Sequence, residues 1–80
     1  MITIYVRVFA TLRSHFPELK LGEAMPVELP EGATVGQLVE HLRLPTGEVK
    51  VVFVNGIVQE SGSQLAAGDE VGIFPSVGGG

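Results

Sequence analysis

The chain has 80 residues, a formal net charge of -4 and no cysteine. This length is that of one small domain, so we take residues 1–80 as a single domain. Hydrophobic residues make up 45% and charged residues 18% of the sequence, a balance that excludes a disordered chain. The lack of cysteine excludes disulfides, thiolate metal sites and an internal thiol nucleophile.

The charge balance and the lack of long apolar runs narrow the classes of partner. Lys and Arg number 5 against 9 Asp and Glu, which gives no positive field for binding nucleic acid. No apolar stretch approaches the roughly 18 residues of a membrane span, and the N-terminus lacks the basic and apolar blocks of a secretory signal. We therefore expect a cytoplasmic protein with no nucleic-acid or membrane partner.

The first part of the chain predicts two strands separated by a helical turn and a loop. Apolar residues alternate with other residues from Ile2 to Val8, the period of a strand with one face on a core. Ala10 to Leu21 predicts a short helical turn leading into a loop. Met25 to Leu29 alternates again, and its prolines favour an edge strand paired with the first.

A capping box predicts where the main helix begins. The hydroxyl of Thr34 can accept from the amide of Gln37, whose side chain can reach back to the amide of Thr34. An apolar stripe would pack this helix on the sheet, and Pro45 prevents the helix from continuing. The stripe consists of Val35, Leu38, Val39 and Leu42.

The second half of the chain predicts three more strands. Val49 to Val54 is a β-branched and aromatic run, and Asn55-Gly56 indicates a type I′ hairpin that returns through Ile57 and Val58. A final strand runs through Val71 to Pro75. The predicted class is α+β, with a mixed sheet of four to five strands packed on one main helix.

The chain stops on Gly78, Gly79 and Gly80, which we assign to a flexible tail over residues 76–80. Glycine has no Cβ, so this tail could enter a channel too narrow for any side chain. The terminal carboxylate would be the only formal charge after Glu70. Phe74 is out of phase with the core residues of its strand, so it either faces outward to dock a partner or packs at the end of the core.

The remaining polar residues predict no catalytic or metal site. Ser14 and His15 are adjacent, but sequence neighbours seldom face each other productively. His41 is expected on the polar face of the helix, and Asp69-Glu70 in a solvated turn. The glycine run lacks the Lys and the Ser or Thr of a phosphate-binding loop. We expect no metal, no bound cofactor and no independent active site.

Taken together, the motifs resemble the ubiquitin-like sulfur carriers, the family of the molybdopterin synthase small subunit (MoaD) and the thiamine sulfur carrier (ThiS). The resemblance implies a β-grasp fold in which the last strand lies beside the first in mid-sheet. It rests on five segments: Val8-Phe9-Ala10-Thr11-Leu12-Arg13, Val35 to Leu42, Val54-Asn55-Gly56, Gly68-Asp69-Glu70-Val71 and Phe74-Pro75-Ser76-Val77-Gly78-Gly79-Gly80.

The same resemblance implies a chemistry for the terminus. An ionised carboxylate is a poor electrophile, so its oxygen must first become part of a better leaving group. An E1-like enzyme would use ATP to adenylate Gly80, and the persulfide of a sulfurtransferase would convert it to a thiocarboxylate. Gly78 and Gly79 would let the tail enter the larger catalytic subunit of a molybdopterin synthase. Phe74, Pro75 and Val77 would dock the partner.

Several functions stay open at this point. The ending at residues 74–77 and the long excursion at 10–26 resemble the molybdopterin branch, which serves molybdenum or tungsten cofactors. A carrier for thiamine thiazole, cysteine or homocysteine synthesis is an alternative. So is a ubiquitin-like modifier joined through Gly80 to a target lysine, and so is a plain binding module whose terminal glycines have no role.

Overall fold

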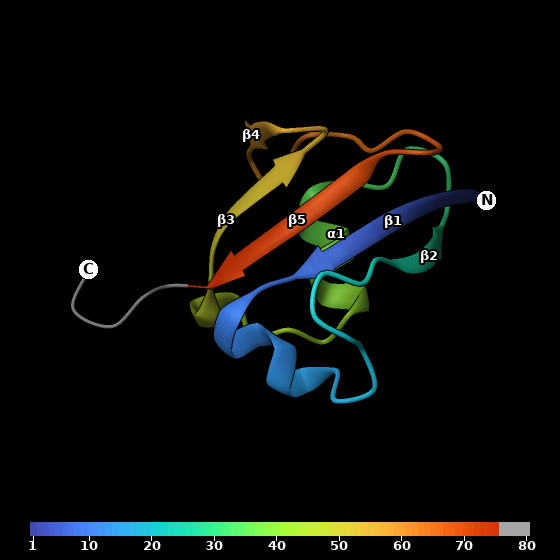
Figure 1. Cartoon of the computed structure of the whole chain (residues 1–80). Coiled ribbons are helices and arrows are strands. Elements are labelled where there is room, and N and C mark those ends of the chain that lie inside the picture. Colours follow the sequence, from blue (N-terminus) through green and yellow to red (C-terminus); the bar gives the residue numbers. More distant parts are fainter. Residues whose placement is uncertain (76–80) are drawn as a thin grey trace.

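A five-stranded mixed sheet curls around one α-helix in the computed structural model, which describes residues 1–75 (Figure 1). The strand order is β2-β1-β5-β3-β4, which confirms the β-grasp fold. Two short 3-10 helices complete the described elements. The bounds are β1 (Ile2–Val8), η1 (Ala10–His15), β2 (Met25–Leu29), α1 (Val35–His41), η2 (Thr46–Glu48), β3 (Val49–Val54), β4 (Ile57–Gln59) and β5 (Glu70–Pro75).

The first and last strands lie side by side at the centre of the sheet. β1 and β5 pair in parallel, with Tyr5 opposite Glu70 and Val8 opposite Ile73. The other strand pairs are antiparallel. Because β1 and β5 run the same way, β5 reaches Pro75 at the end of the sheet opposite to the N-terminus (Figure 1).

Alternate residues of the strands and one stripe of α1 form the core. Ile4 and Val6 of β1, Ile73 of β5 and Leu38 of α1 are fully buried, and Leu12 of η1 closes one end of the same cluster. No polar or charged side chain is buried among the residues whose burial the structure describes, 1–45 and 47–75. The hydrophobic effect of this apolar cluster is therefore the main force that holds the helix on the sheet.

The capping box predicted for α1 is present. Oγ1 of Thr34 accepts from the amide of Gln37 at 3.2 Å, and Oε1 of Gln37 accepts from the amide of Thr34 at 2.9 Å. The helix ends at His41, one residue earlier than the predicted stripe suggested. Arg43 takes a φ of 58°, in the left-handed region, so the chain leaves the helical path before Pro45 is reached.

The edge position predicted for β2 is also confirmed. The amide of Tyr5 donates to the carbonyl of Asp69 at 2.9 Å, so it points toward β5 and away from β2. Pro26 lies opposite Tyr5, and its nitrogen therefore faces the outer edge of the sheet, where no ladder bond is lost. Within residues 1–75, no helix is long and apolar enough to span a membrane.

Candidate functional site: the aromatic face of the sheet

Three phenylalanines cluster on the face of the sheet that points away from α1. The rings of Phe9 and Phe74 stack with centroids 4.3 Å apart and planes 3° from parallel. Phe53 meets Phe74 edge-on, with centroids 5.3 Å apart. Each such pair contributes about 0.5–1.5 kcal/mol beyond the burial of its area. We call Phe9, Phe53 and Phe74 the aromatic face.

The stack depends on a glycine in the middle strand. A Cβ added at Gly72 would lie 3.3 Å from Cε2 of Phe9 and 3.4 Å from Cε1 of Phe74. A side chain at this position would therefore push the rings outward by a few tenths of an ångström, so the glycine lets them lie close over β5. Gly72 and the aromatic face line an open depression of about 560 Å³. An aromatic-lined depression of this kind suits an apolar side chain of a partner protein.

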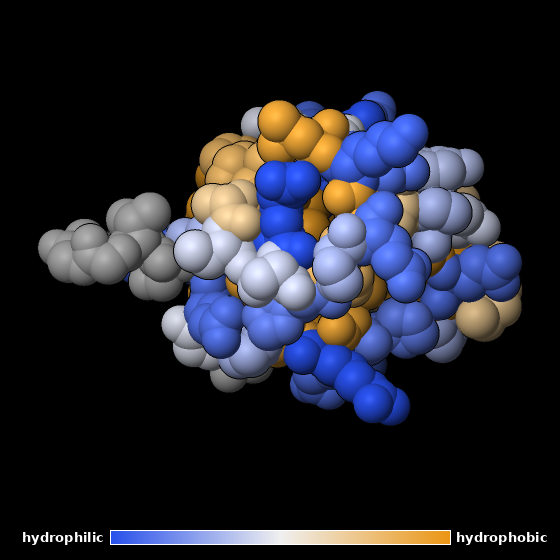
Figure 2. Space-filling model, turned by 60° about the horizontal axis from the view of Figure 1, so that its bottom comes forward, coloured by the Kyte–Doolittle hydropathy of each residue, from blue (hydrophilic) through white to orange (hydrophobic). Residues whose placement is uncertain are grey.

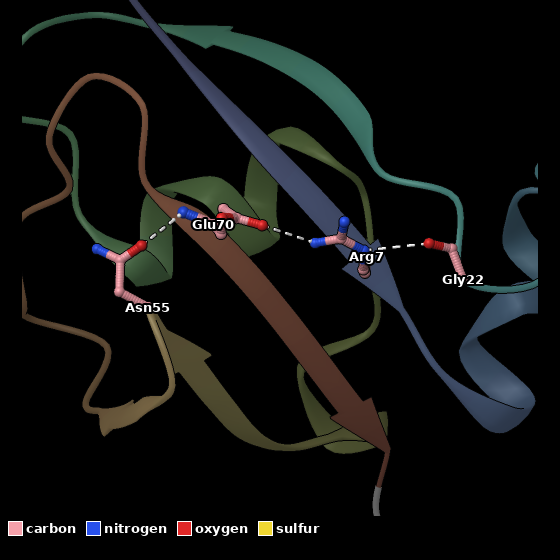
Figure 3. A network of polar contacts seen from close by, with 4 residues as sticks. All are labelled: Arg7, Gly22, Asn55 and Glu70. Carbon is pink, nitrogen blue, oxygen red and sulfur yellow. Dashed lines mark hydrogen bonds and ion pairs between the residues drawn. The ribbon is translucent and has the colours of Figure 1, made fainter.

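Arg7, Asn55 and Glu70 line the same depression, and Figure 3 shows the polar contacts that join them to one another and to Gly22. Nε of Arg7 donates to the carbonyl of Gly22 at 3.1 Å, and its NH1 forms an ion pair with Oε1 of Glu70, also at 3.1 Å. The amide of Glu70 donates to Oδ1 of Asn55 at 2.9 Å. These contacts join β1, β5, the β3–β4 turn and the loop before β2. The ion pair is partly exposed, so its contribution to stability is only about 0–1 kcal/mol.

The position of Phe74 excludes one of the two alternatives left by the sequence, packing in the core. Its neighbour Ile73 is fully buried, whereas Phe74 is half-buried against the other two rings on the outer face. It is therefore outside the core, next to Pro75, the last residue of β5. Its role in docking stays a prediction. Val77, Gly78, Gly79 and Gly80 lie outside the described residues, so their predicted roles also stay predictions.

Ser14 and His15 do not form a catalytic pair. The hydroxyl of Ser14 donates to the carbonyl of Thr11 at 2.9 Å, while Nε2 of His15 lies 3.2 Å from Oε1 of Glu48. Ser14 thus bonds within η1, whereas His15 contacts η2, and the two side chains have separate partners. In the described part of the chain, no group of three or more His, Cys, Asp or Glu residues is arranged to hold a metal ion.

The acidic pair Asp69-Glu70 is divided between two roles. Oδ2 of Asp69 accepts from the amide of Ala66 at 2.8 Å, which closes the predicted turn. Glu70 does not belong to that turn, since it is the first residue of β5 and pairs with Arg7. The prediction of a solvated turn was therefore correct for Asp69 and wrong for Glu70.

The sequence prediction missed Arg7, Phe9, Phe53 and Gly72. A signal for some of them was present, because Arg7 and Phe9 share the outward phase of β1, and Phe53 lies between two buried valines of β3. That signal assigns a face to each residue. It does not bring the residues together, because their contact depends on the register of β1, β5 and β3.

Three comparisons place the chain among known proteins. A profile of the ThiS family matches residues 6–80. The Pyrococcus furiosus protein described as "putative molybdopterin converting factor, subunit 1" is 30% identical, with a TM-score of 0.76 over 96% of this chain and 100% of that one. One crystal structure of SAMP1 from Haloferax volcanii is 28% identical, with a TM-score of 0.71 over 98% of this chain and 99% of that one. Another, of the H. volcanii small archaeal modifier protein 1, is 24% identical, with a TM-score of 0.76 over 96% of this chain and 100% of that one.

A more distant structure supports the fold alone. The Caldiarchaeum subterraneum ubiquitin is 17% identical, with a TM-score of 0.61 over 99% of this chain and 98% of that one. No curated protein matches the chain. The profile match includes the terminal glycines as well as the aromatic face. The chain therefore belongs to the ThiS family of ubiquitin-like sulfur carriers, small proteins that are not enzymes themselves and that work with E1-like activating enzymes and catalytic partner subunits.

Proposed function

We propose that this protein is a cytoplasmic sulfur carrier for molybdopterin biosynthesis, in which the thiocarboxylate of Gly80 donates sulfur toward a molybdenum or tungsten cofactor. The observation that carries the proposal is the similarity, over 96% of this chain and the whole of the other, to the Pyrococcus furiosus protein described as a molybdopterin converting factor subunit. The terminal Gly78-Gly79-Gly80 is the second support, since glycines permit passage through a narrow channel.

The proposed chemistry takes place on Gly80 alone. Its carboxylate oxygen attacks the α-phosphorus of ATP in the E1-like enzyme, and pyrophosphate leaves. The terminal sulfur of a persulfide on the sulfurtransferase attacks the acyl carbon, and AMP leaves. A thiol then cleaves the acyl disulfide, which leaves a thiocarboxylate on Gly80. No step needs a thiol of this chain, which is consistent with the lack of cysteine.

The aromatic face is the surface that supports docking. Five residues follow Pro75, and they span at most roughly 18 Å when fully extended. An enzyme that holds Gly80 in its active site must therefore have its surface within this distance of Pro75. Phe74 precedes Pro75, so the aromatic face lies within the reach of such an enzyme and is the apolar surface next to the end of β5. We thus add Phe9 and Phe53 to the proposed docking residues Phe74, Pro75 and Val77.

Intact-mass spectrometry tests the carrier function. Incubation with the activating enzyme of the same organism, ATP and a persulfide donor should exchange one oxygen of the protein for one sulfur. Deletion of Gly79 and Gly80 should abolish the exchange. Gly62→Ala is a matched control, since a Cβ there would meet no atom within 4 Å and the terminus stays intact. An unchanged mass of the wild-type protein would contradict the proposal.

The pathway needs its own assay. The thiocarboxylated protein is mixed with a molybdopterin synthase large subunit and the pterin precursor, and formation of the dithiolene is measured. Transfer of sulfur is the expected result. If the protein is thiocarboxylated but gives no dithiolene, the molybdopterin assignment is wrong, and thiazole, cysteine or homocysteine synthesis becomes the next reaction to assay.

A protein modifier is the second candidate, favoured by the similarity to small archaeal modifier protein 1. The same acyl adenylate would then be attacked by a lysine amine of a target, forming an isopeptide bond with Gly80. A tagged chain expressed in its native cells would give conjugates of higher mass, and deletion of Gly79 and Gly80 would remove them. Unchanged function after that deletion would instead support a plain binding module.

A further inference from the structure

Leu21 is an exposed apolar residue on a tightly bonded turn. Its relative exposure of 80% is the highest of the large hydrophobic residues described. Polar side chains cover most of the surface seen in Figure 2, and apolar atoms show mainly in one patch at the upper left and in gaps between polar chains. A single exposed leucine is ordinary on a protein surface. The argument below therefore rests on how the turn is held and on where it lies.

Hydrogen bonds within the turn hold its backbone. The amide of Glu23 donates to the carbonyl of Lys20 at 3.0 Å, and the amide of Lys20 donates to Oε1 of Glu23 at 2.8 Å. Gly22 has a φ of 76°, the conformation required at the third position of a type II turn. Leu21 is therefore the second residue of a closed turn, and its side chain is presented with little backbone freedom to lose on binding.

A further hydrogen bond fixes this turn to the rim of the aromatic face. The carbonyl of Gly22 accepts from Nε of Arg7 at 3.1 Å (Figure 3). Arg7 lines the same depression as Phe9, Phe53 and Phe74. A stable interface covers about 800 Å² on each partner, a disc of roughly 16 Å radius. A protein centred on the aromatic face therefore extends over the neighbouring turn.

We propose that Leu21 is a second anchor for the E1-like activating enzyme, inserted into an apolar pocket of that enzyme, and that Arg7 is a positioning residue for the turn. The inference rests on the proposed function, because it requires an enzyme that acts on Gly80. We assign the anchor to the activating enzyme because both the sulfur carrier and the protein modifier need adenylation of Gly80. It is the partner that these functions share.

ATP–pyrophosphate exchange, measured with the full-length chain and the activating enzyme of the same organism, tests the anchor. Leu21→Ser should raise the KM for this protein about tenfold, which corresponds to about 1.4 kcal/mol and exceeds the roughly 1 kcal/mol below which most interface residues fall when truncated. The kcat should not change, because Gly80 is intact. Leu21→Met keeps an apolar side chain of similar size and should therefore keep most of the affinity for the activating enzyme. Ile57→Ser is the matched control and should leave KM unchanged, since Ile57 is 64% exposed but pairs with the buried Val54, which places it on the face of the sheet opposite to the aromatic face.

A double-mutant cycle tests the positioning role of Arg7. Arg7→Lys keeps the positive charge near Glu70 but removes the Nε–H that bonds to Gly22. The effect of Leu21→Ser on KM should be several-fold smaller in the Arg7→Lys background than in the wild type, because the turn is no longer held. Hydrogen exchange of the Glu23 amide should also become faster in Arg7→Lys.

The outcomes separate this inference from the proposed function. If ATP–pyrophosphate exchange occurs but Leu21→Ser leaves the KM unchanged, Leu21 is not an anchor, while the proposed function stands. An equal rise in KM for Leu21→Ser and Ile57→Ser overturns the assignment of a specific pocket. If the effects of Leu21→Ser and Arg7→Lys on KM are additive and hydrogen exchange of the Glu23 amide is unchanged, Arg7 does not position the turn. If the wild-type protein supports no ATP–pyrophosphate exchange, the proposed function is overturned, and this inference fails with it.

Discussion

Replacing Gly72 by alanine tests whether the aromatic face depends on a missing side chain. The new Cβ would lie 3.3 Å from Cε2 of Phe9 and 3.4 Å from Cε1 of Phe74. Carbon atoms are optimally separated by about 3.5–4.0 Å, so the rings must move by a few tenths of an ångström. The φ of Gly72 is outside the left-handed region, so alanine brings no backbone strain.

Two opposing terms decide the change in the free energy of unfolding. Glycine inside a strand costs about 0.5–1 kcal/mol relative to alanine, so the substitution gains this amount. Displacing the stacked rings loses up to about 0.5–1.5 kcal/mol. We therefore expect Gly72→Ala to change stability by less than about 1 kcal/mol, which corresponds to a Tm shift below about 8 °C. Binding of the activating enzyme should weaken, because the rings no longer present the same surface.

Thermal unfolding followed by circular dichroism, with and without Phe9→Ala, measures the ring contact directly. Removing the ring of Phe9 removes the closer of the two contacts, so Gly72→Ala should then stabilise the protein by about 0.5 kcal/mol. If Gly72→Ala gives the same stabilisation with and without the ring of Phe9, the contact is not limiting and the reasoning is wrong. A crystal structure of Gly72→Ala with unmoved rings would contradict it as well.

Three further predictions concern the rest of the fold. Thr34→Ala removes the helix cap and should cost about 1 kcal/mol in urea unfolding, whereas Thr34→Ser should cost much less; equal costs would argue against the cap. Leu38→Ala should cost about 2–5 kcal/mol, because Leu38 is fully buried, and the exposed control Ile57→Ala about 0.5 kcal/mol or less; similar values would contradict the assigned core. Asn55→Asp would place a second carboxylate 3.0 Å from Oδ1 of Asp69, where the two like charges would repel each other in the folded state. Its loss of stability relative to wild type should therefore be larger at pH 7 than at pH 4, and a loss independent of pH would exclude charge repulsion as the cause.

Much of the fold could be predicted because its signals are local. The alternation in β1, the capping box at Thr34 and the Asn55-Gly56 turn each depend on residues within a few positions of one another. Asn55 and Gly56 indeed take φ values of 52° and 84°, as a type I′ turn requires. The end of α1 was less predictable. Pro45 sets only the last position that the helix could reach, and the chain left the helical path earlier, at Arg43.

The candidate site was predictable only in part. The outward phase of Phe74 follows from its position next to Ile73 in the same strand. Its neighbours do not follow in this way, because Phe9 and Phe53 lie on other strands. Their contact requires the parallel pairing of β1 with β5 and the antiparallel pairing of β3 with β5. Gly72 likewise has no local explanation, since the atoms that crowd its position come from Phe9 as well as from its own strand.

The sequence by itself determined the five strands, the position of the main helix and the resemblance of the terminal glycines to those of sulfur carriers. Those features depend on neighbouring residues and on the chemistry of the last carboxylate. Only the tertiary structure decided that Phe9, Phe53 and Phe74 form one surface and that Arg7 holds the turn of Leu21 at its rim. Such contacts join residues far apart in the chain, because burial of the core sets the register that brings them together.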